Sequence, residues 1–533
     1  MAGILDAEVL IAGAGPAGLA LGLALTRLGV DALVVDAAPE PIAEPRAAVV
    51  WPREAELLAA VGLGPALRAA STPLETTGLF MGRRRLGALR FGANDSAFPC
   101  PLLIEQHVLQ HLMLAEIERR GGRVLWRTAL VDFEPRQDRV QATLTAQDGS
   151  TIAASAAWLV GCDGARSQVR KRLGVAFDGS PARNLEVVQV KARLDWPYEP
   201  REGALFLAAN HALGSFPMPG GQRRFYCFKT IDEPQRSSAP SLPEMEALIG
   251  RMMGGAPVAL RDADWLSRAR FQRRIAAHMR VGRVLLAGDA AHVWPAVGGH
   301  GMAMAVQDAC NLAWRLAAVV GQRGPETLLD VYGREQRAQA TALIARMELD
   351  LLERPLPGAL AAGLGLILPG LLKLEGAQSA VELMLSDLTL HRRASPMSVS
   401  AGGGGRPRPG DRVPNVNVLS AGATRRLHEL LTVDAWTLLV PMQADLATLD
   451  PVLRRAGQLR IARIEPADAA ARAALGAMRR LLLVRPDGVI GLNARTGDAG
   501  ALGGYISAWL GPCGPIPRAK AQEPMALQSV PAE

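Results

Sequence analysis

The chain has 533 residues, which is too long for one ordinary core and long enough for two or three domains. Hydrophobic residues make up 49 % and charged residues 21 %, so a disordered or fibrous protein is excluded. The net charge is +8, but arginine alternates with acidic residues along most of the chain. We therefore expect a solvated mixed surface and no nucleic-acid partner.

The five cysteines form no CxxC pair, which fits neither a disulfide framework nor a zinc site. We therefore expect no metal and a cytoplasmic location, and the N-terminus lacks the features of a signal peptide. An uncharged run, Pro355–Leu372, contains two internal prolines and four glycines. It predicts a buried or interfacial helical hairpin and no membrane span.

In chain order, the first elements are a strand at Glu8–Ala12, a helix at Ala17–Leu28 and a strand at Asp31–Asp36. This succession is a βαβ unit, which indicates a parallel sheet. A further helix is predicted over Gln106–Arg120, where Gly121 and Gly122 stop it.

From Leu185 to Phe271 the pattern changes to alternating strands, typical of an antiparallel sheet. One helix interrupts it, with Ser241 as the cap and Glu244 three residues later. Helices return from Gly301 to about residue 390. A stretch rich in glycine and proline, Ala394–Arg412, reads as a linker, and a small α/β unit follows it.

A glycine motif lies directly between the first strand and the first helix. Gly13 permits a tight turn, Gly15 lets the backbone approach a pyrophosphate, and Gly18 lets helix and strand pack closely. Asp36 ends the next strand, where an acid binds a ribose. The motif predicts a dinucleotide site but does not choose between FAD and NAD.

Two later segments make that choice. Asp163-Gly164 follows the apolar run Trp158–Cys162, and Gly288-Asp289 follows Arg283–Ala287. With the glycine motif, in this order, they resemble the fingerprints of the para-hydroxybenzoate hydroxylase family of FAD-dependent aromatic monooxygenases, over roughly residues 8–390. The C-terminal unit resembles the thioredoxin-like appendage of phenol hydroxylases and aromatic polyketide hydroxylases. Without a CxxC pair we expect it to serve packing or dimer formation.

The resemblance implies an α/β fold made of a Rossmann-type FAD-binding domain, an inserted antiparallel-sheet substrate domain and a thioredoxin-like domain. The FAD-binding domain would comprise residues 1–177 and 276–396, with a helical extension over 320–396. The substrate domain would span 178–275. A linker at 397–412, the thioredoxin-like domain at 413–515 and a tail at 516–533 complete the chain.

The resemblance also implies a role for individual residues around a non-covalent FAD. The glycine motif with Ala17 would hold the pyrophosphate, Asp36 the ribose, and Gln106 the flavin side. Asp163 would serve the cofactor and the approach of NAD(P)H, with Arg166 and Arg170 as charge partners. The remaining cofactor-binding residues are Arg46 near the pyrophosphate, Gly288 and Asp289 at the ribityl chain, and Pro295, Gly299, Gly301, Met302 and Ala303 along the ring.

The sequence departs from the family in the loop beside the flavin ring. Ala296 stands where the family has proline, His300 where it has glutamine or lysine, and Ala303 where it has asparagine. Backbone N–H groups at 301–303 can still stabilise negative charge on reduced flavin. Our candidate catalytic residues are His300 and Pro295 in this loop and His211 and Tyr226 in the antiparallel region, where Arg224 is a further candidate.

The implied reaction uses NADPH or NADH to reduce the flavin, to which O₂ adds before one oxygen atom passes to a phenolic or polycyclic aromatic substrate. Two alternatives stay open: Baeyer–Villiger oxygenation of a polycyclic ketone, and a flavoprotein that holds a substrate without turnover. The oligomeric state is left open, with a homodimer as the candidate.

Overall fold

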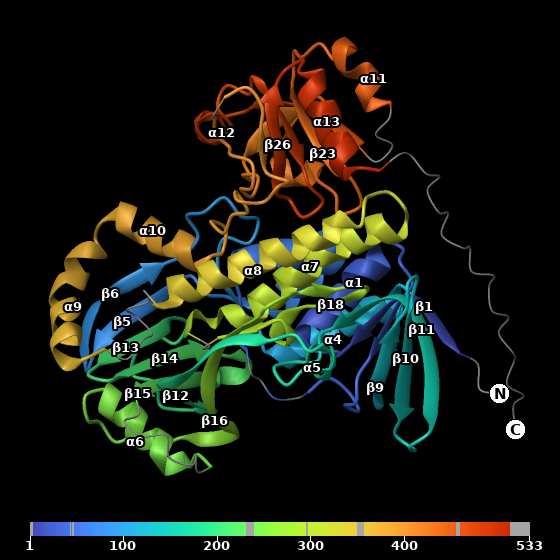
Figure 1. Cartoon of the computed structure of the whole chain (residues 1–533). Helices are drawn as coiled ribbons and strands as arrows, with labels where there is room; N and C mark the ends of the chain where they lie inside the picture. The colour runs from blue at the N-terminus through green and yellow to red at the C-terminus, as the bar shows by residue number, and fades with distance from the viewer. Residues whose placement is uncertain are drawn as a thin grey trace, which may run out of the picture.

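The computed structural model describes residues 4–42, 44, 47–230, 239–294, 297–348, 356–403, 405–454 and 459–511. Two large sheets lie side by side, helices α7 (His300–Val320) and α8 (Thr327–Glu348) run above them, and a C-terminal unit sits on those helices (Figure 1). The predicted α/β class is confirmed. Arg46, Pro295, Ala296 and the tail after residue 511 lie outside the described residues.

The main sheet is the nucleotide-binding layer. Its strand order is β17-β18-β11-β1-β2-β8, with β9 and β10 attached to β11. The strands from β18 to β8 run parallel, which agrees with the predicted βαβ unit. The bounds are β1 Leu5–Ala12, β2 Ala32–Val35, β8 Arg123–Leu125, β9 Thr128–Pro135, β10 Val140–Ala146, β11 Thr151–Gly161, β17 Arg280–Val281 and β18 Val284–Leu286.

Helices cover this sheet because their apolar residues face it. The helix α1 (Pro16–Arg27) has nine buried residues and starts at Pro16, whose fixed φ and missing N–H suit a first helical position. The helix α4 (Gln106–Arg119) begins at the predicted residue and ends before Gly121, whose φ of 76° is left-handed. Shorter elements nearby are β3 Val49–Val50, α2 Pro52–Leu58, α3 Gly64–Ala70, β4 Thr72–Pro73, β7 Leu102–Leu103 and α5 Gln168–Arg172.

The second sheet has the order β19-β16-β12-β15-β14-β13-β5-β6. Two of its strands, β5 and β6, precede the predicted insertion at 178–275, and β13 pairs with β5 in parallel. The sequence did not reveal this addition because pairing between distant strands leaves no local pattern. The bounds are β5 Thr76–Met81, β6 Arg84–Arg90, β12 Phe177–Arg193, β13 Gly203–Ala208, β14 His211–Pro217, β15 Arg223–Thr230, β16 Arg261–Ala276 and β19 His292–Val293.

The helix α6 (Leu242–Met252) covers one face of this second sheet. Ser241 caps it as predicted, since its Oγ accepts the N–H of Glu244 at 3.3 Å. Its buried Met245 and Ile249 pack against Val188, Leu213 and Phe225 of the sheet. The opposite face is left for the site described below.

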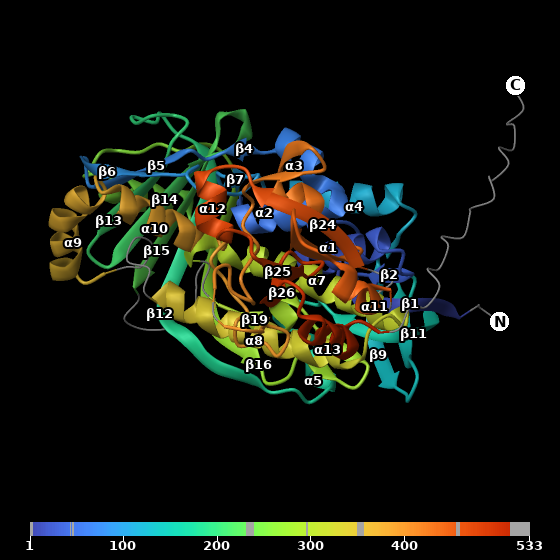
Figure 2. The same cartoon turned by 90° about the horizontal axis from the view of Figure 1, so that it is seen from above.

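The C-terminal unit is a seven-stranded sheet in the order β20-β26-β25-β23-β24-β21-β22. It lies over α7 and α8, as the view from above shows (Figure 2). The bounds are β20 Val399–Ser400, β21 Asn417–Ser420, β22 Ala423–Arg426, β23 Trp436–Pro441, α11 Asp450–Leu453, β24 Leu459–Pro466, α12 Ala469–Leu475, β25 Arg480–Val484, β26 Ile490–Arg495 and α13 Ala499–Trp509.

The segment expected as a linker is buried at both ends, at Met397 and Arg412, whereas its described residues 402, 403, 405 and 406 are exposed. Its strand β20 pairs in parallel with β26, and Met397 just before it is fully buried. Glycine and proline content reports backbone conformation and says nothing about burial, which is why composition alone did not predict the contacts at the two ends of this segment.

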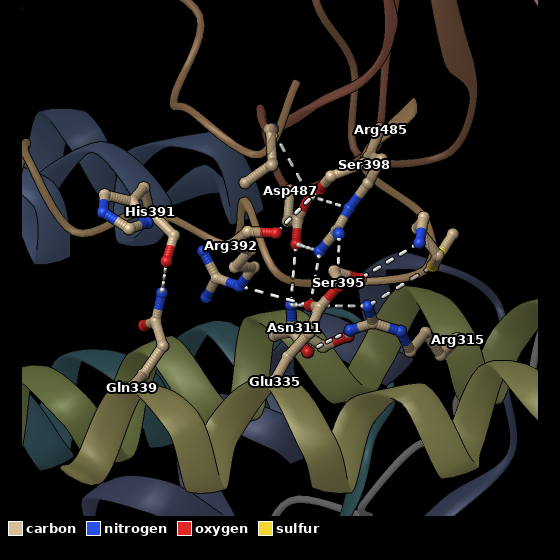
Figure 3. A network of polar contacts seen from close by, with 12 residues as sticks. Asn311, Arg315, Glu335, Gln339, His391, Arg392, Ser395, Ser398, Arg485 and Asp487 are labelled. Atoms are coloured by element: carbon tan, nitrogen blue, oxygen red, sulfur yellow. Dashed lines mark hydrogen bonds and ion pairs between the residues drawn. The ribbon is translucent and has the colours of Figure 1, made fainter. Parts of the chain in front are cut away.

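Buried charges join the C-terminal unit to α7 and α8 (Figure 3). Arg485 contacts Glu335 of α8 through two nitrogens at 2.7 and 3.0 Å. Asp487 accepts from Asn311 of α7 at 2.8 Å. We call this set the joint; its other members are Arg315, Arg392 and Ser395 around Glu335, and Arg53, Glu56, Asp95 and Arg412 beside it.

The uncharged run forms one helix and not a hairpin. The helix α9 (Gly358–Leu371) buries Ala361, Gly365 and Leu368, while Leu366 is 74 % and Ile367 61 % exposed. It meets α10 (Glu375–Leu385) at 114°. Among the described residues no single helix has the length and apolarity to cross a membrane; by these criteria only the bent pair α9 and α10 qualifies.

Candidate functional site

Four parallel strands of the main sheet end at one edge, and each leads there to a residue that the three motifs or the nearby acid Asp36 predicted for the site. The strand β1 leads to Gly13, β2 to Asp36, β11 to Asp163 and β18 to Gly288, and these strands are neighbours in the order β18-β11-β1-β2. Ligands bind at this carboxyl edge in open α/β sheets. The three motifs, separated by more than a hundred residues in sequence, therefore form one site.

Contacts that only glycine permits hold these motifs together. A Cβ at Gly13, whose φ is 106°, would overlap the Cys162 carbonyl at the end of β11. A Cβ at Gly18 would overlap the Gly13 carbonyl, so α1 touches the turn below it. At Gly288 (φ 62°) a Cβ would lie 2.7 Å from the Cβ of Ala17. The motif before α1 thus contacts both later motifs directly.

Gly15, the middle glycine of the motif before α1, faces open space. A Cβ at Gly15 would meet no described atom within 4 Å, and no side chain of the described residues caps the N-terminus of α1. The first N–H groups of a helix lack internal partners and carry partial positive charge. An open, uncapped helix N-terminus behind a glycine turn fits a pyrophosphate.

Asp36 fixes the glycine turn through its carboxylate. One oxygen accepts the N–H of Ala14 at 2.7 Å and the other the N–H of Ala38 at 2.8 Å. Each oxygen has a second lone pair, so a ribose contact remains compatible with this arrangement. Gln110, which the sequence did not single out, donates to the Ala14 carbonyl at 3.3 Å and accepts from Gln106 at 3.3 Å.

Asp163 organises the second motif through backbone contacts that the sequence did not predict. Its Oδ2 accepts the N–H groups of Gln168 at 2.7 Å and Val169 at 3.1 Å, so it caps α5, and its Oδ1 is buried without a partner among the described residues. The Asp163 charge acts on Arg170, although burial has the larger effect on its pKa, and Arg170 donates its hydrogen bond to the Ala290 carbonyl at 2.8 Å; Arg166 is exposed. Arg170 thereby ties the second motif to the third.

A buried acid behind the third motif was missed by the sequence analysis. Asp308 of α7 accepts the N–H of Gly288 at 2.8 Å and lies 2.6 Å from Nε2 of His292. Burial opposes protonation of His292, but the Asp308 carboxylate raises its pKa above the ordinary value. The carboxylate of Asp289 is on the exposed side of the same turn. The signal that could have found Asp308 is an acidic residue within a largely apolar helix.

The loop before α7 turns on Gly298 and Gly299, both left-handed with φ values of 72° and 68°. Gly301 again faces open space, whereas Met302 is 6 % exposed. Ala303 is fully buried against Val49, Trp51, Leu74 and Leu103. His300 is buried as well, and its contacts are described below.

An aromatic surface of the second sheet faces this loop. Phe216 packs against the cluster that contains Ala303, and its ring centroid is 5.6 Å from that of Tyr226. The row continues through Phe228 and Phe271 at 5.5 and 6.3 Å. A Cβ at Gly214 would overlap the Tyr226 ring, so this glycine gives the ring its place.

Two arginines with different roles lie at the edge of this aromatic face. Arg224 stacks over Trp265 at 3.8 Å and donates to Gln189 at 2.8 Å, and burial lowers its pKa to about 9. Arg223, the preceding residue, points to the other face, where it donates to Ser215 and stacks over Trp196. Alternation along β15 therefore selects Arg224 for the aromatic face.

His211 does not join the other candidates. It pairs with Lys229 across β14 and β15, on the side of the sheet that α6 covers, and its Nδ1 is 3.0 Å from the Ala209 carbonyl. Tyr226 lies on the opposite face, since one strand position separates the two sets. The strand pairing, which decides the face, was not available from the sequence.

The geometry defines a dinucleotide-binding α/β oxidoreductase fold with an aromatic face beside its nucleotide edge. The description "FAD binding domain" matches residues 6–347, and "Aromatic-ring hydroxylase, C-terminal" matches 406–513. The chain belongs to the family of FAD-dependent aromatic monooxygenases, as the resemblance predicted, and FAD is its cofactor.

Named relatives and solved structures agree with this assignment. The chain is 32 % identical to 6-methylpretetramide 4-monooxygenase of Streptomyces rimosus, over 81 % of this chain and 79 % of that protein. An anhydrotetracycline hydroxylase of the same species has a TM-score of 0.76 at 29 % identity, covering 95 % and 100 % of the two chains. Aklavinone-11 hydroxylase, solved with FAD and aklavinone, has a TM-score of 0.74 at 27 % identity, covering 95 % and 99 %.

Proposed function

We propose that this chain hydroxylates a polycyclic aromatic, polyketide-like small molecule with NAD(P)H and O₂. The relatives named above take their names from 6-methylpretetramide, anhydrotetracycline and aklavinone. The observation that carries the proposal is the aromatic face from Phe216 to Phe271, which lies against the flavin loop. Flat aromatic rings pack well on such a surface.

We assign the cofactor positions to this chain's own groups. The uncapped α1 N-terminus with Gly13, Gly15, Ala17 and Gly18 would hold the pyrophosphate. The other proposed contacts are those of Asp36, Arg46, Gln106, Asp163, Gly288, Asp289, Pro295 and residues 299–303. FAD, once reduced by NAD(P)H, supplies the oxygen chemistry. The protein binds it, orients it, and lines the space beside it with apolar side chains.

Tyr226 is our choice for contact with the substrate. Its ring lies on Gly214 and joins the aromatic row, so we expect it to orient the substrate ring. Its matched control is His211, which lies on the other face of the same sheet. We retain a homodimer and the cytoplasm as proposals, and light scattering of the purified holoprotein tests the former.

The test is NADPH oxidation by the purified holoprotein with aklavinone or anhydrotetracycline as probes. We expect stimulated oxidation and a product that carries one atom from ¹⁸O₂ on a ring carbon, as seen by NMR. Gly214→Ala should displace Tyr226 and raise KM, while His211→Gln should leave KM unchanged. Insertion of oxygen into a ring would instead indicate Baeyer–Villiger chemistry. No stimulated oxidation with any polycyclic aromatic would contradict the proposal.

A further inference from the structure

His300 is a buried residue at the first turn of α7, directly after the left-handed Gly299. The residue is 2 % exposed, and its Nδ1 lies 3.1 Å from Oδ2 of Asp387. Its ring stacks on the Trp51 indole, with centroids 5.2 Å apart and planes at 15°. The imidazole is therefore held by an acid on one side and by an aromatic ring on its face.

Asp387 collects partners from two helices. Its Oδ1 accepts from Arg346 of α8 at 2.6 Å, and its Oδ2 also accepts from Gln307 of α7 at 3.3 Å. Burial opposes ionisation, but His300 and Arg346 together hold the pKa of Asp387 below its ordinary value. The carboxylate is thus a buried, fully partnered anion just after α10.

Trp51 contacts the same loop through a hydrogen bond as well as through its ring. Its Nε1 donates to the Gly298 carbonyl at 2.9 Å, two residues before His300. The remaining acidic group here is Glu54, whose Oε2 accepts the backbone N–H of Trp51 at 3.3 Å. Burial raises the pKa of Glu54 well above its ordinary value. Burial therefore disfavours the ionised form of Glu54, and the carboxylate that contacts the His300 ring is that of Asp387.

We infer that His300, Asp387 and Trp51 form a brace that fixes the backbone of residues 298–303 beside the flavin. His300 is then a positioning residue and not an acid or base of the reaction. A histidine at a position where the family has glutamine or lysine needs a buried partner, and this chain supplies it 87 residues later. The inference rests on the proposed function, because the flavin is the group the loop serves.

The brace is tested on the apoprotein by flavin fluorescence titration and on the holoprotein by its midpoint potential. His300→Gln and Asp387→Asn should each weaken FAD binding by about tenfold, a size typical of coupled buried pairs. The double variant should be no weaker than the worse single variant, because both changes break the same contact. The potential should become more negative, since loosened N–H groups stabilise the reduced flavin less.

Two further variants keep the test decisive. Trp51→Phe retains a stacked ring and loses only the bond to Gly298, so it should weaken FAD binding in the same direction and by less. His391→Gln, an exposed histidine in the segment after Asp387, should change neither quantity. Additive losses in the double variant, or an unchanged affinity and potential together with a lost limb of the kcat–pH profile, would overturn the brace. Wild-type protein that binds FAD but oxygenates no aromatic contradicts the proposed function alone.

Discussion

The nucleotide edge of the main sheet and the joint beneath the C-terminal unit are held by opposite means. At the edge, backbone meets backbone: Gly13, Gly18 and Gly288 allow contacts that any side chain would block. At the joint, long charged side chains meet in the interior, with Arg315 and Glu335 at 0 % and 3 % exposure. The edge leaves N–H groups open for a ligand, whereas the joint consumes its polar groups internally.

The two regions therefore contribute differently to domain placement and to ligand binding. Replacing a buried ion network by apolar residues is often neutral, but removing one partner leaves an uncompensated charge and is costly. The joint therefore fixes how the C-terminal unit sits on α7 and α8, while the edge fixes what the protein binds. Because α7 runs from the flavin loop to Asn311 and Arg315, both regions act on one helix.

Glu335→Gln should have the largest effect on the joint. Glu335 is the shared partner of Arg315, Arg392 and Arg485, so the change removes the carboxylate that three buried cations share, although Arg485 keeps Asp487. We expect a loss of about 3–5 kcal/mol in the free energy of unfolding, measured by urea titration. Asp450→Asn, which breaks only an exposed pair with Arg454, should leave the midpoint unchanged. Equal midpoints for the two variants would show that the joint carries no stability.

The joint should also make stability depend on pH through His428. Burial and the Arg412 guanidinium lower the pKa of His428 from 6.5 to about 4. The unfolded chain binds this proton below pH 6.5 and the folded chain does not until about pH 4, so stability falls as pH drops through that window. The full loss is roughly 3 kcal/mol.

His428→Gln should remove this part of the pH dependence, as followed by urea unfolding at several pH values between 7 and 4. The exposed His391→Gln should keep the wild-type dependence. Asp487, whose pKa is lowered to about 2 because Arg485 and Arg392 outweigh its burial, contributes only at lower pH. An unchanged slope in His428→Gln would mean that this histidine does not sense the joint.

Gly18→Ala addresses the edge. The new Cβ would overlap the Gly13 carbonyl, so α1 must move away from the turn that faces the pyrophosphate. Overpacking of this kind costs about 1–3 kcal/mol, which we expect to appear as weaker FAD binding in a fluorescence titration. Gly504→Ala in α13, where a Cβ meets no described atom within 4 Å, is the matched control. Identical affinities in both variants would separate the glycine turn from the cofactor.

The two regions also differ in how far the sequence predicts them. The glycine motif, Asp163 and Gly288 are local patterns at strand ends, and parallel strands bring such ends to one edge. The joint is invisible in the sequence because its partners are as far apart as Arg53 and Asp487, and its arginines look like surface residues.

The sequence did not predict the surroundings of several single residues, for related reasons. His211 and Tyr226 lie on different faces, which depends on strand pairing. The proposed role of His300 rests on its contact with Asp387, which no sequence pattern connects to it. Asp308 was hidden because its partner Gly288 lies 20 residues earlier on another element.

The most direct test of the cofactor edge is a flavin fluorescence titration of apoprotein carrying Asp289→Ala. The account places this carboxylate at the carboxyl end of β18, on the exposed side of a turn that Asp308 holds from behind. A charge-assisted bond contributes about 1.5–3 kcal/mol, so FAD affinity should fall at least about tenfold. Asp289→Asn should lose less, and Asp445→Ala in the C-terminal unit should lose nothing. Equal affinities for wild type and Asp289→Ala would contradict FAD binding at this edge.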